Sequence, residues 1–190
     1  MSITSVKSGA TGISLALDNN FMEPIATTLV GSTSVNSITF NDIPQGYKHL
    51  QIRWTARNNA AFNSFDPSLI RFNSDASNNY TAHYLTGNGS SANAGASTSI
   101  NYGWIGLTNY GNTTASVFSV GVTDILDYSN TNKFKTIRAL SGADCNGSGE
   151  AFFSSSLWQS TNAISSITLY SNGNGNFVQH SRFSLYGIKG

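Results

Sequence analysis

The sequence YKHLQIRWTA at residues 47–56 alternates polar and apolar side chains along most of its length. Successive side chains of a β-strand point to opposite faces of a sheet, so this pattern predicts a strand with one buried face. Leu50, Ile52 and Trp54 would share the buried face, and the polar side chains between them would face solvent. The stretch therefore predicts a sheet that covers a core on one side.

Short segments of the same kind recur along the chain, and turns that contain Gly, Pro or Asn separate them. About ten short strands with turns every 8–12 residues or so are typical of an all-β sandwich or barrel. We therefore predict an antiparallel β-sandwich that is jelly-roll-like, with a closed barrel as the alternative. The low-complexity residues 87–99 predict a long exposed loop. The expected strands lie near 25–30, 35–40, 47–56, 68–73, 80–86, 100–107, 115–126, 133–140, 150–158, 163–170 and 176–188.

A chain of 190 residues fits one domain with a single core, because domains usually hold about 100–200 residues. Its 39% hydrophobic residues include 11 Phe, 8 Tyr and 3 Trp, which is enough to fill such a core. The residues that we expect in the core are Ile38, Phe40, Leu50, Ile52, Trp54, Ile125, Leu126, Ile137, Ile167, Leu169, Phe183 and Leu185.

Charged residues make up only 10% of the chain, whereas a typical soluble domain carries about 25%. The net charge of +1 leaves no basic stripe that could neutralise phosphates, so we expect no nucleic-acid partner. Cys145 is the only cysteine, which rules out an intrachain disulfide and favours folding in the cytosol. No apolar segment near the start is long enough for a signal peptide or a membrane anchor, so we expect no membrane partner.

The first 22 residues differ from the regular pattern that follows. We predict that residues 1–22 form an extended N-terminal arm and that residues 23–190 form the sandwich domain. An arm of this kind adds a strand to the sheet of a neighbouring protein. The alternative is a first strand within the domain's own sheet. The arm residues that we expect to pair or pack on a partner are Ile3, Val6, Ile13, Leu15 and Leu17.

No arrangement of residues in the sequence predicts catalysis. The chain has no G-x-S-x-G elbow, and His49, His83 and His180 have no acidic residue near them in sequence. Asp124 and Asp127 would point to opposite faces of a strand, so they do not form the carboxylate pair of a glycosidase. We therefore expect a protein that is not an enzyme and has no catalytic residue.

The sequence also predicts no cofactor and no metal. Residues 75–79 space their side-chain oxygens like a calcium loop, but Tyr80 replaces the glycine and Thr86 replaces the glutamate that such a loop needs. Two G-N-G stretches begin like dinucleotide-binding loops but lack the third glycine and a following helix. We interpret all three stretches as turns.

One stretch could bind a ligand. Tyr102, Trp104 and Tyr110 lie in NYGWIGLTNYGN at residues 101–112, and aromatic faces beside amide groups suit a saccharide. The alternative, which we favour, places these aromatic residues in the core or in a subunit interface.

Several longer stretches are distinctive. They are SVKSGATGISLALDNNFMEPIATTLVGS at 5–32, IPQGYKHLQIR at 43–53, RFNSD at 71–75, DILDYSNTNKFKTIRALSG at 124–142, SLWQSTNAISSITL at 156–169 and FVQHSRFSLYGIKG at 177–190. On these stretches the chain resembles a widespread family of tailed-bacteriophage virion proteins. The resemblance covers nearly the whole chain and implies a small β-sandwich component of the virion. It carries no catalytic residue.

Within that resemblance, the compact domain and the neutral surface favour a capsid cement or decoration protein that clamps the outside of the head. Its partners would be the major capsid protein and copies of itself, most simply in a trimer, since the strand edges lack the lysines that discourage edge pairing. It would be assembled in the host cytoplasm and would lie on the outer surface of the virion. The alternative is a tail fibre or receptor-binding module that contacts a tail protein and recognises host surface glycans. An enzyme that acts on glycans is disfavoured, because the carboxylate pair is missing.

Overall fold

The computed structural model describes residues 21–61, 65–172 and 175–190. In these ranges the chain forms twelve β-strands and no helix. The strands are β1 (Met22–Leu29), β2 (Ser37–Phe40), β3 (His49–Ala56), β4 (Phe65–Phe72), β5 (Tyr80–Gly87), β6 (Ala92–Ile100), β7 (Gly103–Asn109), β8 (Ser119–Ile125), β9 (Lys135–Asp144), β10 (Gly149–Trp158), β11 (Ile167–Ser171) and β12 (Arg182–Ile188).

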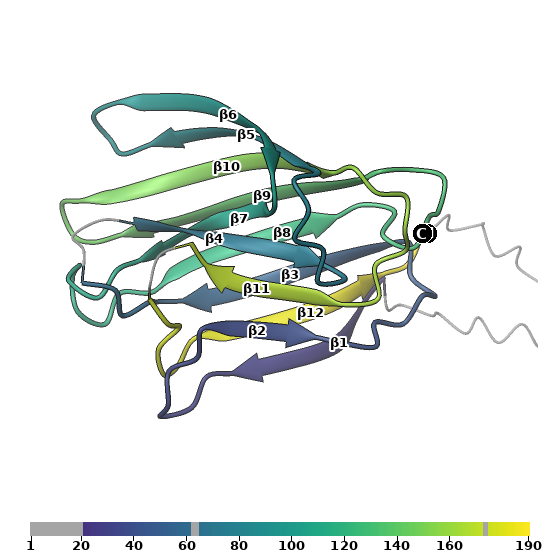
Figure 1. Ribbon diagram of the computed structural model, residues 1–190. Coiled ribbons are helices and arrows are strands. Elements are labelled where there is room, and N and C mark those ends of the chain that lie inside the picture. Colours follow the sequence, from purple (N-terminus) through teal and green to yellow (C-terminus); the bar gives the residue numbers. More distant parts are fainter. Residues whose placement is uncertain (1–20, 62–64, 173–174) are drawn as a thin grey trace, which may run out of the picture.

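The strands form two antiparallel sheets that pack face to face as a sandwich (Figure 1). The large sheet has the order β1-β12-β3-β8-β9-β10-β5-β6, and the small sheet has the order β2-β11-β4-β7. Early strands pair with late ones: β1 with β12, β2 with β11, β3 with β8 and β4 with β7. This nested pairing, in which successive pairs alternate between the two sheets, is that of a jelly roll. The predicted fold is therefore confirmed.

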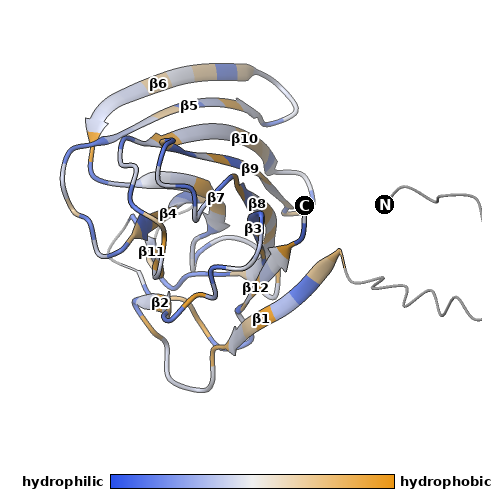
Figure 2. Cartoon of the chain, turned by 90° about the vertical axis from the view of Figure 1, so that its right-hand side faces the viewer, coloured by the Kyte–Doolittle hydropathy of each residue, from blue (hydrophilic) through white to orange (hydrophobic). Residues whose placement is uncertain are grey.

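Four further strands extend the large sheet beyond the jelly roll. β9 and β10 follow β8 in the sheet, and the β5–β6 hairpin pairs with the far side of β10. The large sheet therefore has eight strands, and it curves around a small sheet of only four (Figure 2). We call β10, β5 and β6 the wing, because they form the end of the large sheet that extends beyond β7, the last strand of the small sheet, with β10 still in contact with β7.

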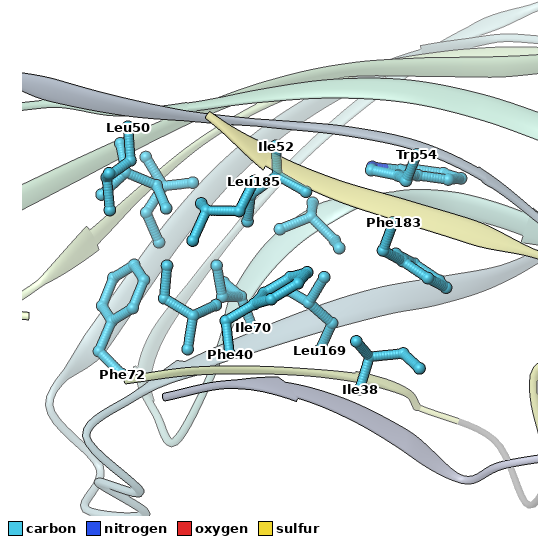
Figure 3. Packing of buried hydrophobic residues seen from close by; sticks show 14 of the residues in the cluster. Ile38, Phe40, Leu50, Ile52, Trp54, Ile70, Phe72, Leu169, Phe183 and Leu185 are labelled. Atoms are coloured by element: carbon cyan, nitrogen blue, oxygen red, sulfur yellow. The ribbon is translucent and has the colours of Figure 1, made fainter. Parts of the chain in front are cut away.

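The core lies between the two sheets. Side chains of β3 and β12, among them Leu50, Ile52 and Leu185, point toward Phe40 and Leu169 of the small sheet (Figure 3). The alternation in residues 47–56 is thus confirmed. The other predicted core residues are also buried, with one exception.

That exception is Leu126, whose side chain is 37% exposed. Leu126 directly follows Ile125, the last residue of β8, and the side chain of Ile125 is fully buried. Two consecutive side chains of an extended chain cannot face the same side. The prediction of Leu126 as a core residue was therefore wrong.

The predicted loop at residues 87–99 was also wrong, because most of it forms β6. β6 pairs with β5 around a tight turn, in which Oδ1 of Asn88 accepts hydrogen bonds from the backbone N–H groups of Ser90 (3.0 Å) and Ser91 (2.9 Å). Main-chain hydrogen bonds to β5 hold this strand. Such bonds form whatever the side chains are. The sequence of β6, ANAGASTSI, has no alternation of apolar and polar residues, so the strand could not be recognised from its pattern.

Side-chain hydroxyls of the large sheet close the free edge of β7. Because β7 is the last strand of the small sheet, one row of its backbone groups has no neighbouring strand. Three serines of the large sheet accept hydrogen bonds from these N–H groups: Ser156 from Trp104 (3.1 Å), Ser141 from Leu107 (3.0 Å) and Ser119 from Asn109 (2.9 Å). The buried serines of β8, β9 and β10 thereby join the two sheets.

Candidate functional site

An exposed row of apolar side chains crosses the outer face of the large sheet. The strand register places Val122 of β8 opposite Leu140 of β9, Leu140 opposite Phe153 of β10, and Phe153 opposite Leu85 of β5. The exposed fraction is 55% for Leu140, 42% for Phe153 and 52% for Leu85, and Val122 is half-buried. We call these four residues the outer apolar row. With strands about 4.8 Å apart, the row extends for about 14 Å.

A polar row borders the outer apolar row, two residues further along each strand. Asp124 is its centre: one carboxylate oxygen accepts a hydrogen bond from Nε2 of Gln51 (2.8 Å), and the other pairs with the guanidinium of Arg138 at 2.7 Å. Nε of Arg53 in turn donates to Oε1 of Gln51 (2.9 Å). The charges beside the apolar row are therefore held in a fixed arrangement.

A hollow of about 770 Å³ lies on the same face at the β8 end of the row. Val120, Val122 and Leu140 are among the apolar residues that line it, and Arg53 and Arg182 are the cationic residues that line it. Neither arginine forms an ion pair within the described residues. The hollow thus combines an apolar floor with a cationic rim.

A second candidate surface is a smaller crevice of about 240 Å³ between β7 and the wing. Four aromatic residues line it, Phe65 of β4 among them, and the rings of the other three contact one another. The ring centroids of Tyr84 (β5) and Trp104 (β7) lie 4.9 Å apart, and the ring of Phe152 (β10) lies 5.9 Å from Tyr84 and 6.1 Å from Trp104. We call this site the aromatic crevice.

The three aromatic residues that the sequence singled out contact different parts of the molecule. Trp104 lies in the aromatic crevice. The hydroxyl of Tyr110 donates a hydrogen bond to Oδ1 of Asp66 (3.0 Å), and burial together with this carboxylate raises the pKa of Tyr110 to about 12. Tyr102 directly precedes β7, and burial together with the phenol of Tyr102 raises the pKa of Tyr170 of β11. All three side chains are partly exposed.

The proposed arm residues Ile3, Val6, Ile13, Leu15 and Leu17 lie outside the described residues. Their role therefore stays a prediction.

Sequence reasoning missed most of both surfaces, although one signal was present. Phe152 and Phe153 are consecutive residues of a strand, so only one of them can face the core. Phe152 points inward to the aromatic crevice and Phe153 points outward in the apolar row. Pairs of adjacent large apolar residues in a strand therefore indicate an apolar outer face.

The calcium-like residues 75–79 form a turn that uses its own oxygens. Oδ1 of Asp75 accepts a hydrogen bond from the backbone N–H of Ser77 (2.9 Å), and Oδ2 accepts from Nδ2 of Asn79 (2.8 Å) and Nε1 of Trp158 (2.8 Å). Partial burial alone would raise the pKa of Asp75, but these hydrogen bonds outweigh it and lower the pKa to about 2. The carboxylate therefore fastens this turn to β10.

Two buried cations are fixed by backbone carbonyls. The guanidinium of Arg57 donates hydrogen bonds to the carbonyl oxygens of Gly111, Thr113, Thr114 and Val117. The ammonium of Lys135 donates to the carbonyl oxygens of Asn130, Lys133 and Thr161. Because these donors are occupied by loops of the same chain, we interpret both side chains as structural.

Across the described ranges, no group of three His, Cys, Asp or Glu side chains lies close enough to hold a metal ion. Nor does this part of the chain contain a helix with the length and apolar character of a membrane span. Compared with known proteins, the chain matches no family model and no curated protein. The function must therefore be argued from the two surfaces.

Proposed function

We propose that this chain is a structural protein of a tailed-phage virion, and that it attaches to the outside of the head as a cement or decoration protein. The outer apolar row is the observation that carries the proposal. Its large side chains stand side by side on a sheet face that nothing else in the described chain covers. The resemblance of the sequence to phage virion proteins supports the same conclusion.

A partner that covered the outer apolar row would remove its exposed apolar side chains from water. Proteins that remain monomers rarely expose large apolar side chains in a contiguous patch. Removing apolar surface from water contributes about 25 cal/mol per Å². The net charge of +1 adds little repulsion between copies that crowd together on a particle. An exposed sheet face with an apolar centre therefore suits a protein that covers part of a larger assembly.

The partners in this proposal are the major capsid protein and further copies of this chain, most simply in a trimer. The cationic rim of the hollow adds a requirement, because a surface that covers Arg53 and Arg182 must offer carboxylates or remain wet there. The protein would lie on the outer surface of the virion after assembly in the host cytoplasm. Neither nucleic acid nor a membrane takes part.

Attachment to heads that lack this protein tests the proposal. A Leu140→Ser, Phe153→Ser double variant should bind such heads at least about tenfold more weakly and keep its melting temperature, since both side chains are exposed. Phe134→Ser is the matched control: Phe134 is 49% exposed and directly precedes β9, six residues or about 20 Å from Leu140. Unchanged binding by the double variant would overturn the proposed docking face.

The second candidate function is a tail-associated module that recognises host surface glycans. The aromatic crevice favours it, because the partly exposed rings of Tyr84 and Trp104 lie beside polar groups, which suits saccharides. The two functions differ in copy number, since a decoration protein covers the head in many copies and a receptor-binding module occupies a few positions on the tail.

A further inference from the structure

The aromatic crevice is built where the two sheets differ in width. The small sheet ends at β7, whereas the large sheet continues through β10 and β5 to β6 (Figure 1). The inner face of the wing is therefore only partly covered: β7 contacts β10 through Ser154 and Ser156, and beside that contact the wing opens into the crevice. The crevice lies between this face and the outer side of β7, and Tyr84, Thr86, Glu150 and Phe152 line its wing side.

The three aromatic rings form a corner. The rings of Tyr84 and Phe152 are nearly parallel, with 16° between their planes, and Trp104 is tilted from them by 58° and 56°. The ring of Tyr84 lies directly over Gly95 of β6, since a Cβ atom at that position would be 2.6 Å from the ring. Any other residue at position 95 would displace the Tyr84 ring.

The backbone of Trp104 is fixed from the large sheet. Its N–H donates to Oγ of Ser156 (3.1 Å), and its carbonyl accepts from Oγ of Ser154 (3.3 Å). Both serines belong to β10, the strand that carries Phe152 and Glu150. The same strand therefore positions the tryptophan and supplies two further residues of the crevice, so that the site is rigid before any ligand arrives.

Four polar groups of the crevice have no hydrogen-bond partner within the described residues. They are the carboxylate of Glu150, the hydroxyl groups of Tyr84 and Thr86, and the indole N–H of Trp104. None of the four is both fully shielded from solvent and unbonded. They are therefore accessible donors and acceptors beside an aromatic surface, which is the composition of a small-molecule site.

We propose that the aromatic crevice binds one ring of a neutral pyranose saccharide. A pyranose presents polarised C–H groups, which are attracted to the negative face of an aromatic ring. Its hydroxyl groups can both donate and accept hydrogen bonds. They can therefore pair with the acceptor of Glu150, the donor of Trp104 and the hydroxyls of Tyr84 and Thr86. A volume of about 240 Å³ is below the roughly 300–1,000 Å³ of most small-molecule pockets, so the crevice holds one ring while the rest of a longer glycan stays in solvent.

The charge of the crevice selects among sugars. Glu150 is its one ionisable acid, and no Lys or Arg lines it. A sialic or uronic acid would place a second carboxylate beside Glu150 without a cation to offset the repulsion. Neutral hexoses and N-acetylhexosamines should therefore be preferred. This inference holds for a protein on the head or on the tail, and it does not depend on the outer apolar row.

Titration of the ¹⁵N-labelled full chain with saccharides tests the proposal. The probes are the methyl pyranosides of glucose, galactose, mannose and N-acetylglucosamine, with glucuronic acid and N-acetylneuraminic acid as the anionic group. The indole cross-peak that disappears in Trp104→Phe belongs to Trp104. At least one neutral probe should move this peak at tens of millimolar and leave the indole peaks of Trp54 and Trp158 in place, and the anionic probes should bind more weakly.

Variants separate a site from a structural role. Trp104→Ala and Glu150→Gln should each weaken binding about tenfold, as read from probe saturation-transfer signals, while the melting temperature shows that the domain is folded. Gly95→Val should have the same effect through the displaced Tyr84 ring, although it touches no polar group. Phe153→Ala, on the opposite face of β10, should bind like the wild type. The proposal is overturned if no neutral probe moves the Trp104 peak, if anionic probes bind as well, or if Phe153→Ala loses binding equally.

Discussion

Replacing Ile52 by alanine should lower the free energy of unfolding by about 2–5 kcal/mol, whereas replacing Leu140 should change it by no more than about 0.5 kcal/mol. Ile52 of β3 is fully buried between the sheets, opposite Leu185 of β12 in the strand register. Leu140 of β9 belongs to the same sheet but points to the outer face. The two changes therefore compare the two faces of one sheet.

The magnitude follows from the surroundings of Ile52. Truncation to alanine removes three carbon atoms from a site enclosed by both sheets, and the backbone of a central strand cannot move in to fill the space. In a domain of this size, about 1 kcal/mol shifts the melting temperature by roughly 2–4 °C. The melting temperature of Ile52→Ala should thus be about 4–20 °C below that of the wild type.

Urea unfolding followed by circular dichroism measures both variants. The midpoint should fall for Ile52→Ala at an unchanged slope, which indicates a change of stability and not of the unfolded state. The protein should be dilute enough to be monomeric. Self-association through the outer face would raise the free energy of unfolding of the wild type, and Leu140→Ala would then appear to destabilise the monomer. Equal losses for the two variants, or a larger loss for Leu140→Ala, would refute the assignment of the faces.

Three further predictions test other parts of the structure. Ser156→Ala removes the acceptor for the Trp104 N–H and should cost about 1–3 kcal/mol in urea unfolding; no loss would mean that this bond does not join the sheets. The pKa of Asp75 is lowered to about 2, so its contribution to stability is present above about pH 4 and is lost as the pH falls toward 2. Asp75→Asn should lack this part of the acid dependence, and an identical pH profile would contradict the role of the carboxylate. Deleting residues 1–20 should leave a folded sandwich, since β1 begins at Met22, and should abolish attachment to heads; an unfolded product would make the segment an internal strand, and full attachment would remove its role as an arm.

The local alternation of apolar residues predicted the sandwich because it acts over a few residues. Leu50, Ile52 and Trp54 are buried as their spacing requires. β6 could not be found in this way, because small and polar residues form it and its stability comes from the backbone bonds to β5. Composition alone does not distinguish such an edge strand from a loop.

The candidate sites depend on contacts that no local pattern contains. Trp104 was noticed in the sequence, but its partners Tyr84 and Phe152 come from strands that the order of the large sheet brings together. The outer apolar row likewise exists only through the register of β8, β9, β10 and β5. The order and register of the strands in the sheets therefore create both surfaces, and only the three-dimensional structure reveals them.

The central claim is that this chain is a structural component of the virion. Quantitative mass spectrometry of purified particles, with the major capsid protein as the internal standard, tests it most directly. A decoration protein should be present in hundreds of copies per particle and should be lost from particles that carry the Leu140→Ser, Phe153→Ser variant. A handful of copies would move the protein to the tail, and its absence from the particles would contradict the account.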